Sequence, residues 1–453
     1  MRTGDIINIS VSDMTYGGEG IGRYQGMAVF VPDSVPGDEL RVRVVEQKKS
    51  FAKARIAEII KPSADRVEPK CPLAKECGGC QWQQISYPAQ LRYKTKIVQD
   101  TLERVGHIKG LKVRDILGMK EPWHFRNKIQ YPISGTRDKG QGVMMGYYKQ
   151  GTHDVVDVDS CPIEHPKLSK AANIVKDVLN KLGYSAYNED KSPGLFRHLR
   201  ARIGFGTGEV LLTFITNEKV IPGAQRLIKE VLNKCKAEDI NVVGICQNIN
   251  PRQTNVIMGE KSWTMWGRDY IYDKMKGLKF KVSNSSFYQT NPIQTEVLYD
   301  TALEFSGVTA KDTIIDAYSG IGTVALWFAK HAEYVYGIEE VKEAVEDAAE
   351  NAELNKITNC RFNHGKVEKL LPELDSGDIL VLDPPRGGCE EKVLKTIGKS
   401  QLKKIIYISC NPGTLARDLA YLSDNGFKVD IVQPVDMFPH SFHIESVTKI
   451  VRG

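Results

Sequence analysis

The sequence predicts a multidomain protein with a small β-barrel, a central α+β domain and a C-terminal α/β domain built on a doubly wound parallel sheet. Three observations predict this organisation. Short apolar runs broken by glycines fill residues 1–61, cysteines cluster at residues 71–80, and strand and helix patterns alternate regularly from residue 281 to residue 453. A chain of 453 residues is also too long for one ordinary core, so two or three domains are expected.

The composition is that of a globular protein, with 41% hydrophobic and 26% charged residues. No apolar stretch has the length of a signal peptide core or of a membrane span, so we expect a cytoplasmic protein without a membrane partner. The net charge of +6 does not by itself indicate nucleic acid, and local basic clusters carry that information instead. Nine cysteines in such a chain favour metal ligation, catalysis or burial over a disulfide framework.

Residues 1–61 contain five short apolar runs with alternating polar positions, at a spacing that predicts a small closed or nearly closed barrel. Barrels of this kind often grip single-stranded RNA. Lys48, Lys49, Lys53 and Arg55 lie close in sequence to Phe51, and a basic patch around an aromatic ring suits RNA stacking. A solvated hairpin on a structural barrel is the alternative of equal weight.

A polar, proline-flanked linker at residues 62–69 leads to a cysteine array with the spacing Cys71-x5-Cys77-x2-Cys80. Cys161 has a similar cysteine–proline setting and can serve as a fourth ligand. Four thiolates suit zinc or an iron–sulfur cluster. The five-residue gap departs from the usual zinc pairs, so we favour the cluster, and it also departs from the spacing of radical enzymes.

The central domain is expected at residues 70–280, with a basic amphipathic helix in residues 82–110. Within it, residues from about 90 to 112 are expected to pack on the C-terminal domain. From about residue 115 the pattern turns to strands that we expect to be antiparallel, with helices at residues 168–182 and 224–236. The aromatic and basic residues 124–128 are either an RNA clamp or an ordinary strand edge.

The C-terminal domain is expected at residues 281–453, and its first strand ends in a glycine-containing turn from Asp316 to Thr323. Two glycines let a ligand approach the backbone where the strand turns into a helix. One strand and helix later, Glu339 is placed to accept hydrogen bonds from ribose hydroxyls. Neither a P-loop nor the G-x-G-x-x-G pattern is present, so this order indicates an adenosine cofactor such as S-adenosylmethionine rather than ATP or NAD.

Two later strands end in residues with reactive side chains. Asp383 precedes two prolines, which hold its carboxylate in a rigid loop. Cys410 follows a β-branched run and precedes a helix, whose first N–H groups and dipole are expected to favour the thiolate. Glu445 stands just before the closing strand, and taken alone it is more often a surface residue than a catalytic one.

Five motifs together resemble those of the RNA uracil-5-methyltransferases, and the resemblance covers essentially the whole chain. The cysteine array and the barrel are similar to the branch of this family that carries an iron–sulfur cluster and an N-terminal TRAM domain and modifies 23S rRNA. The motifs are Ser286-Phe-Tyr-Gln-Thr-Asn291, Asp316-Ala-Tyr-Ser-Gly-Ile-Gly322, Leu382-Asp-Pro-Pro-Arg386, Ser409-Cys-Asn-Pro-Gly-Thr-Leu-Ala-Arg-Asp418 and Asp436-Met-Phe-Pro-His-Ser-Phe-His-Ile-Glu445.

The resemblance implies a Rossmann-like methyltransferase that works by covalent catalysis. Cys410 would be the nucleophile that adds to C6 of uracil, and Glu445 the base that takes the C5 proton. Thr323 stands where some relatives have Asn, which weakens its assignment to the cofactor. The matching positions for S-adenosylmethionine are Gln289, Tyr318, Thr323, Glu339 and Asp383. The matching ligands of a 4Fe-4S cluster are Cys71, Cys77, Cys80 and Cys161.

The expected partner is 23S rRNA, with a single-stranded or loop uridine flipped into the site of a monomeric enzyme. The same reaction on tRNA is the close alternative. Cytosine-5 methylation is disfavoured because the proline–cysteine or threonine–cysteine setting of those enzymes is absent at Cys410. An RNA-binding protein with an inactive methyltransferase fold and an iron–sulfur redox protein are further alternatives from other classes.

Overall fold

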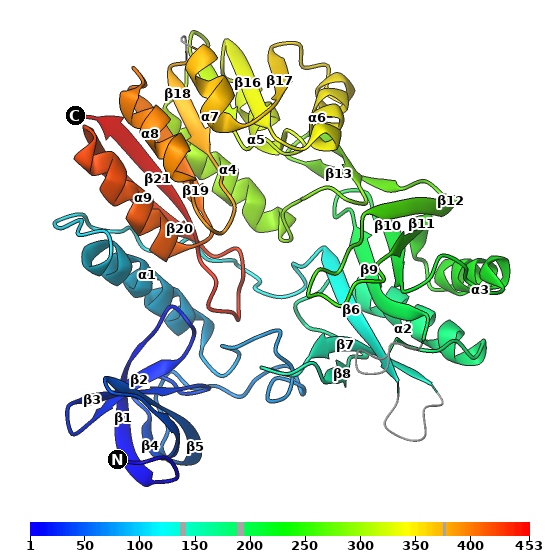
Figure 1. Ribbon diagram of the computed structural model, residues 1–453, viewed down its shortest axis with the longest axis horizontal. Coiled ribbons are helices and arrows are strands. Elements are labelled where there is room, and N and C mark those ends of the chain that lie inside the picture. The colour runs from blue at the N-terminus through cyan, green and yellow to red at the C-terminus, as the bar shows by residue number, and fades with distance from the viewer. Residues whose placement is uncertain (136–141, 188–193, 375–376) are drawn as a thin grey trace.

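The computed structural model describes residues 1–135, 142–187, 194–374 and 377–453. Figure 1 shows the barrel at one end of the molecule, the central sheet beside it and the C-terminal sheet above both. In the described ranges no helix combines the length and the apolar character that a membrane crossing requires.

The N-terminal strands form a closed barrel in the order β1-β2-β3-β5-β4. Along β1 and β4 the inward residues alternate with exposed ones, and the inward set is aliphatic, as the sequence pattern predicts. Closure leaves no free strand edge, which explains how so small a unit buries its core. The strands are β1 (Ile6–Met14), β2 (Gly20–Tyr24), β3 (Met27–Val31), β4 (Glu39–Gln47) and β5 (Phe51–Lys61).

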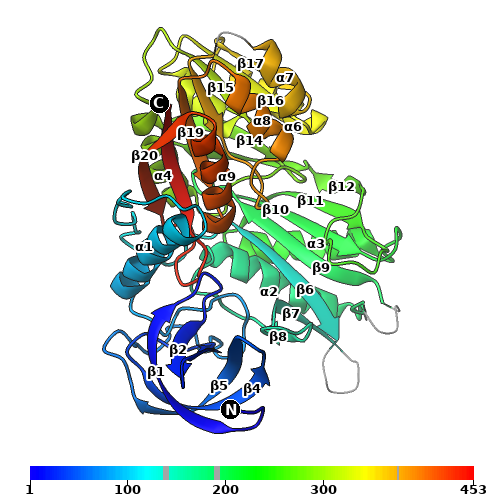
Figure 2. The ribbon, with the colours of Figure 1, turned by 60° about the vertical axis from the view of Figure 1, so that its left-hand side comes forward.

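Helix α1 (Tyr87–Arg104) lies between the barrel and the C-terminal sheet (Figure 2). It begins with a proline in its first turn and buries Ile97, Val98 and Leu102 in the core of the C-terminal part. The helix contacts α9 (Pro412–Asp424) and β20 (Phe427–Val435). This segment therefore belongs by its packing to the C-terminal core.

The central sheet has seven strands in the order β12-β11-β10-β9-β6-β7-β8. Helices α2 (Pro166–Lys181) and α3 (Ala224–Ala237) pack their apolar residues into its core. The antiparallel expectation is wrong for one pair, because α3 is a crossover connection that makes β10 and β11 parallel. The strands are β6 (Lys128–Gly135), β7 (Val143–Tyr148), β8 (Val155–Asp157), β9 (Phe196–Ile203), β10 (Glu209–Thr216), β11 (Asn241–Ile249) and β12 (Lys261–Gly267).

A two-stranded hairpin of β13 (Tyr270–Met275) and β14 (Leu278–Ser283) joins the central sheet to the C-terminal part. The chain then enters α4 (Pro292–Ser306), whose N-terminus is capped by the Asn291 side chain. Phe280 and Val282 of β14 pack into the same core as the C-terminal sheet.

The C-terminal sheet runs in the order β17-β16-β15-β18-β19-β21-β20, with five parallel strands and an antiparallel pair at one edge. The predicted doubly wound sheet is confirmed, and its strand order reverses between β15 and β18. Ligands of such sheets bind at the carboxyl ends of the strands that flank this switch point. The elements are β15 (Thr313–Ala317), α5 (Thr323–Ala329), β16 (Tyr334–Glu339), α6 (Lys342–Leu354), β17 (Cys360–His364), α7 (Val367–Leu370), the 3₁₀ helix η1 (Leu371–Glu373), β18 (Ile379–Leu382), α8 (Glu391–Lys399), β19 (Lys404–Ser409), α9, β20 and β21 (Glu445–Arg452).

Candidate active site

Cys410 lies at the carboxyl end of β19, one strand away from the switch point. The next residue, Asn411, caps α9 through its side-chain oxygen, which accepts hydrogen bonds from Gly413 N at 2.9 Å and Thr414 N at 3.5 Å. This cap ends the strand abruptly and holds the cysteine in the short bend between strand and helix. The thiol is half-buried.

Glu445 reaches the same place from the other direction of the chain. Strands β19 and β21 are antiparallel, with Ser409 opposite Ser446. The next pair beyond it, at the carboxyl end of β19, is Cys410 beside Glu445, because residue numbers rise along one antiparallel strand as they fall along the other. Glu445 is only 4% exposed, so of its two sequence interpretations the surface one is wrong.

The thiol and two carboxyl groups share one electrostatic environment. Burial, reinforced by the charges of Glu445 and Asp383, raises the pKa of Cys410 to about 12, and Arg386 opposes the shift. Burial raises the pKa of Asp383 to about 7 and, together with the Asp383 charge, holds the pKa of Glu445 well above its usual range.

The helix N-terminus therefore does not by itself make the thiolate in the substrate-free protein. The expectation drawn from the helix dipole is outweighed by burial and by two nearby carboxylates. The thiol proton must pass to a base before the sulfur can attack, and Asp383 is ionised above about pH 7. The cluster is thus arranged to move protons among its members.

The glycine-containing turn after β15 is tied to the end of β16. Glu339 accepts hydrogen bonds from the Gly320 and Val341 amides at 2.9 and 2.8 Å. Tyr318 has a φ of +74°, a strained value for a residue with a side chain, and its amide binds Ile338 O at 3.0 Å. A Cβ added to Gly320 would meet no atom within 4 Å, so the turn faces open space.

Two buried polar side chains in this turn lack hydrogen bonds within the described ranges. The unpaired atoms are the two carboxylate oxygens of Asp316 and the hydroxyl oxygen of Ser319. Burial, with the charges of Asp383 and Glu339, raises the pKa of Asp316 well above its ordinary value, and the nearby backbone of Ala325 opposes the shift. Leaving a buried carboxyl group unpaired costs folding free energy. A cationic ligand with a donor group at the turn would pair with Asp316 and Ser319. Neither Asp316 nor Ser319 was predicted as a site residue, although both lie in the motif of residues 316–322.

The other residues predicted for cofactor binding occupy separate positions around this edge. Thr323 is the first residue of α5, and its hydroxyl lies 3.0 Å from the hydroxyl of Tyr299. Gln289 precedes α4, and its backbone carbonyl accepts a hydrogen bond from Asn127. The Tyr318 hydroxyl is directed toward Cys389, so this side chain lies on the α8 side of the turn.

The four cysteines predicted as metal ligands gather in one region, although Cys161 is distant in sequence from the others. The charges of Cys71 and Cys77 act on Cys80, and that of Cys80 acts on Cys161. Burial is the main cause that raises the pKa of Cys80 to about 11. In the described part of the chain, however, no group of three or more His, Cys, Asp or Glu side chains is arranged to hold a metal ion.

Residues 124–128 differ in exposure: His124 is exposed, Arg126 and Lys128 are half-buried, and Lys128 begins β6, which is an inner strand and not a sheet edge. Phe125 is 2% exposed and packs in a small core with Met119 and Ile163, against which Cys80 and Cys161 also pack. The Arg126 guanidinium lies in electrostatic range of Glu164 and of the same two cysteines. This segment therefore stabilises the cysteine region, because Cys80 and Cys161 pack against the small core that contains Phe125.

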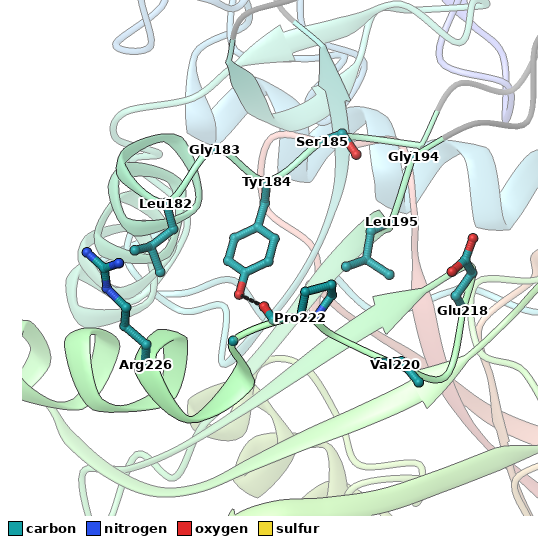
Figure 3. Close-up of a pocket in the computed structure, with 11 residues that line it drawn as sticks. Leu182, Gly183, Tyr184, Ser185, Gly194, Leu195, Glu218, Val220, Pro222 and Arg226 are labelled. Carbon is teal, nitrogen blue, oxygen red and sulfur yellow. Dashed lines mark hydrogen bonds between the residues drawn. The ribbon is translucent and has the colours of Figure 1, made fainter.

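A separate hollow of about 510 Å³ opens between the end of α2 and the start of α3 (Figure 3). Tyr184 lines it and donates a hydrogen bond to Pro222 O, and Glu218 and Arg226 stand at its sides. None of the residues predicted for catalysis, cofactor or metal lines this hollow.

Known proteins resemble this chain along its whole length. The sequence matches the family described as tRNA (Uracil-5-)-methyltransferase over residues 254–452 and the TRAM domain family over residues 2–57. An uncharacterized RNA methyltransferase of Halalkalibacterium halodurans is 45% identical over 447 residues, which cover 98% of this chain and 96% of that protein. Another from Caldanaerobacter subterraneus is 42% identical over 456 residues, which cover 100% of this chain and 99% of that protein.

A solved structure shows a similar fold. The tRNA (uracil-54, C5)-methyltransferase of Pyrococcus abyssi, crystallised with S-adenosyl-L-homocysteine, is 27% identical and superposes with a TM-score of 0.78. The match covers 98% of this chain and 100% of that one, so barrel, central part and C-terminal sheet are all included.

Proposed function

Since the chain belongs to the family of TRAM-containing RNA methyltransferases with a tRNA (uracil-5-)-methyltransferase domain, we propose that it methylates C5 of a uridine in 23S rRNA through a covalent Cys410 intermediate. The observation that carries the proposal is the meeting of Cys410 and Glu445 at one end of β19 and β21, beside Asp383. The methyl donor is S-adenosylmethionine, the cofactor of this family.

The two acidic side chains at the glycine-containing turn, the buried Asp316 and the half-buried Glu339, fit this cofactor. S-adenosylmethionine carries a sulfonium and an ammonium group, and Asp316 is a buried carboxylate with no hydrogen bond in the described ranges. We assign Glu339 to the ribose hydroxyls, because its carboxylate is anchored by two amides and keeps lone pairs free. Gln289, Tyr318, Thr323 and Asp383 complete the proposed cofactor site. When bound, the cofactor supplies an electrophilic methyl group.

The Cys410 residue begins the chemistry on the base. Its proton passes to a carboxylate of the cluster, and the sulfur then forms a bond to C6 of uracil. The electron pair of the C5–C6 double bond moves toward C5 and O4, which makes C5 a nucleophile. A new bond forms between C5 and the methyl carbon as the bond from that carbon to the sulfonium sulfur breaks.

The Glu445 residue completes the reaction. It takes the proton from C5, the C5–C6 double bond re-forms, and the sulfur of Cys410 leaves with the bonding pair. Because burial holds the pKa of Glu445 high, the carboxyl must lose its own proton to solvent before this step; the resulting carboxylate is a stronger base than one in water, which suits removal of a carbon-bound proton. The target base must be unstacked first, because its C6 face is covered within a helix.

The RNA class is proposed as 23S rRNA, and tRNA is the second candidate. The barrel and the upstream cysteines resemble the branch that modifies 23S rRNA, whereas the similar Pyrococcus abyssi enzyme is named for a tRNA uracil. Methylation of both RNAs, each purified from cells that lack the enzyme, tests the choice. Labelled methyl groups in 23S rRNA alone are expected, and labelling of tRNA alone would overturn the assignment.

We also propose that Cys71, Cys77, Cys80 and Cys161 hold a 4Fe-4S cluster. The donor set has the right number and kind of ligands, and the half-buried Arg126 nearby would offset the negative charge of a thiolate-ligated cluster. Methyl transfer involves no electron transfer, so we assign the cluster to holding the RNA-binding region together. Iron and sulfide analysis of protein purified without oxygen is expected to give four of each, and a single zinc ion would refute the cluster.

The covalent mechanism is tested with RNA that carries 5-fluorouridine at the target position. Fluorine cannot leave C5 as a cation, so the methylated adduct at Cys410 is expected to survive denaturation. Cys410→Ala is the matched control and should form no adduct while retaining RNA affinity. Failure of the wild-type protein to form an adduct on an RNA that it demonstrably methylates would end this account.

A further inference from the structure

The turn between β1 and β2 of the N-terminal barrel reaches the candidate active site. The Tyr16 hydroxyl donates a hydrogen bond to the backbone carbonyl of Cys410, with an oxygen–oxygen distance of 3.4 Å. The Tyr16 ring meets the ring of Phe442 edge to face, with centroids 6.2 Å apart. A residue near the start of the chain therefore contacts both segments that carry the proposed nucleophile and base.

The turn is held in this position by several specific contacts. Gly18 has a φ of +87°, and a Cβ there would lie 2.8 Å from Cδ1 of Phe442, so only glycine fits. The Gly18 carbonyl accepts a hydrogen bond from Nε1 of the fully buried Trp82 at 3.1 Å. Thr15 closes the turn, because its amide binds Glu19 O and its carbonyl accepts from the Gly18 amide.

Trp82 also links the turn to the segment before Glu445. The amides of Gln81 and Trp82 both donate to the carbonyl of His440, at 3.1 and 3.0 Å. The barrel turn, the segment around Trp82 and residues 440–442 therefore form one packed unit.

Tyr16 faces charged groups of the active site. Burial, with the charges of Cys410 and Glu445, raises the pKa of the Tyr16 phenol to about 12, and Arg386 opposes the shift. The phenol is therefore neutral near pH 7 and remains a hydrogen-bond donor while the thiol and the carboxyl groups change charge. Its side chain is half-buried.

We propose that Tyr16 is a positioning residue of the methyl transfer, supplied by the barrel, whose hydroxyl holds the Cys410 backbone in the orientation that the attack on C6 requires. This inference rests on the proposed function. It gives the barrel a second role besides RNA binding, because the barrel then completes the active site. An RNA too short to reach the rest of the barrel still depends on Tyr16.

The test compares Tyr16→Phe with Tyr24→Phe in the full-length protein. Tyr16→Phe keeps the ring contact with Phe442 and removes only the hydroxyl, whereas Tyr24 lies on the barrel's own core and serves as the matched control. The measurements are kcat and KM for methylation, and the first-order rate of adduct formation on saturating 5-fluorouridine RNA.

For Tyr16→Phe we expect kcat and the adduct rate to fall about 3- to 10-fold, the effect of one net hydrogen bond, with KM unchanged. Tyr24→Phe should match the wild type. An effect of Tyr16→Phe on KM alone, or one that vanishes with a minimal stem-loop RNA, would assign the residue to RNA tethering and overturn the proposal. Wild-type rates would do the same.

Failure of the proposed function and failure of the role of Tyr16 give different experimental results. If the wild-type protein methylates no uridine, the proposed function is wrong before Tyr16 is considered. If the wild type methylates RNA and forms the adduct while Tyr16→Phe behaves identically, only the role of Tyr16 is refuted.

Discussion

Substituting Lys94 by methionine should destabilise the C-terminal part strongly. Lys94 lies on α1 with a fully buried side chain, and its Nζ is 2.6 Å from Oδ1 of the equally buried Asp436. The same nitrogen donates to Phe438 O at 3.0 Å. Without the lysine, the Asp436 carboxylate keeps Tyr87 as a hydrogen-bond donor, at 2.9 Å, but loses its counter-charge.

Removing one partner of a buried ion pair costs about 3–5 kcal/mol, because the other charge is left without compensation. A typical domain is stable by about 5–15 kcal/mol, so Lys94→Met should remove a large part of the margin. Asp436 also begins the segment that leads to Glu445, and methylation activity should therefore decline at lower urea concentrations than in the wild type.

Lys96→Met is the matched control on the same helix. The Lys96 side chain is 49% exposed and pairs with Asp13 and Asp100, so the substitution should cost only about 0–1 kcal/mol. Urea unfolding followed by tryptophan fluorescence measures both variants. Lys94→Met combined with Asp436→Asn should regain part of the loss, since the buried charge is then absent. Equal stability of the Lys94 and Lys96 variants would refute the reasoning.

Three further predictions concern the active site. Glu445→Gln should leave the C5 proton in place, so that Cys410 stays bonded to ordinary uridine RNA in a complex visible on a denaturing gel; wild-type turnover by this variant would exclude the base role. Asp316→Asn should weaken S-adenosylhomocysteine binding about 10-fold or more by calorimetry, the effect of a charged hydrogen bond, without lowering the melting temperature of the free protein. Arg386→Gln should raise the pKa of Cys410 further, because Arg386 now opposes its upward shift. Alkylation of that thiol by iodoacetamide, followed by peptide mass spectrometry, should slow about 3- to 10-fold at fixed pH, and unchanged alkylation would contradict the electrostatic assignment.

The strands of the C-terminal sheet were predictable where they are apolar runs, as in β15, β18 and β19. Such strands are buried on both faces, which leaves a continuous hydrophobic pattern in the sequence. Strand β17 leaves no apolar run in the sequence because it lies at the sheet edge, where Arg361 and Asn363 interrupt the pattern. An edge strand needs only its backbone to pair and leaves little trace in composition.

In the central sheet, the relative direction of two paired strands could not be predicted from the sequence pattern. Strands β10 and β11 were both expected, and so was the helix between them, but their parallel pairing was not. A strand's periodicity reports how it is buried, whereas its direction relative to a neighbour depends on the connection. The connection here crosses the sheet through α3, and this favours the parallel arrangement.

The sequence by itself determined the architecture of the C-terminal sheet and the residues at its carboxyl edge, because local apolar patterns, turn residues and motif spacing are all written along the chain. Only the tertiary structure revealed that Tyr16 meets Cys410, that Lys94 is paired with Asp436, and that Asp316 is buried without a hydrogen bond within the described ranges. The physical reason is that contacts between distant residues, and the burial that shifts their pKa values, arise only when separate elements pack together.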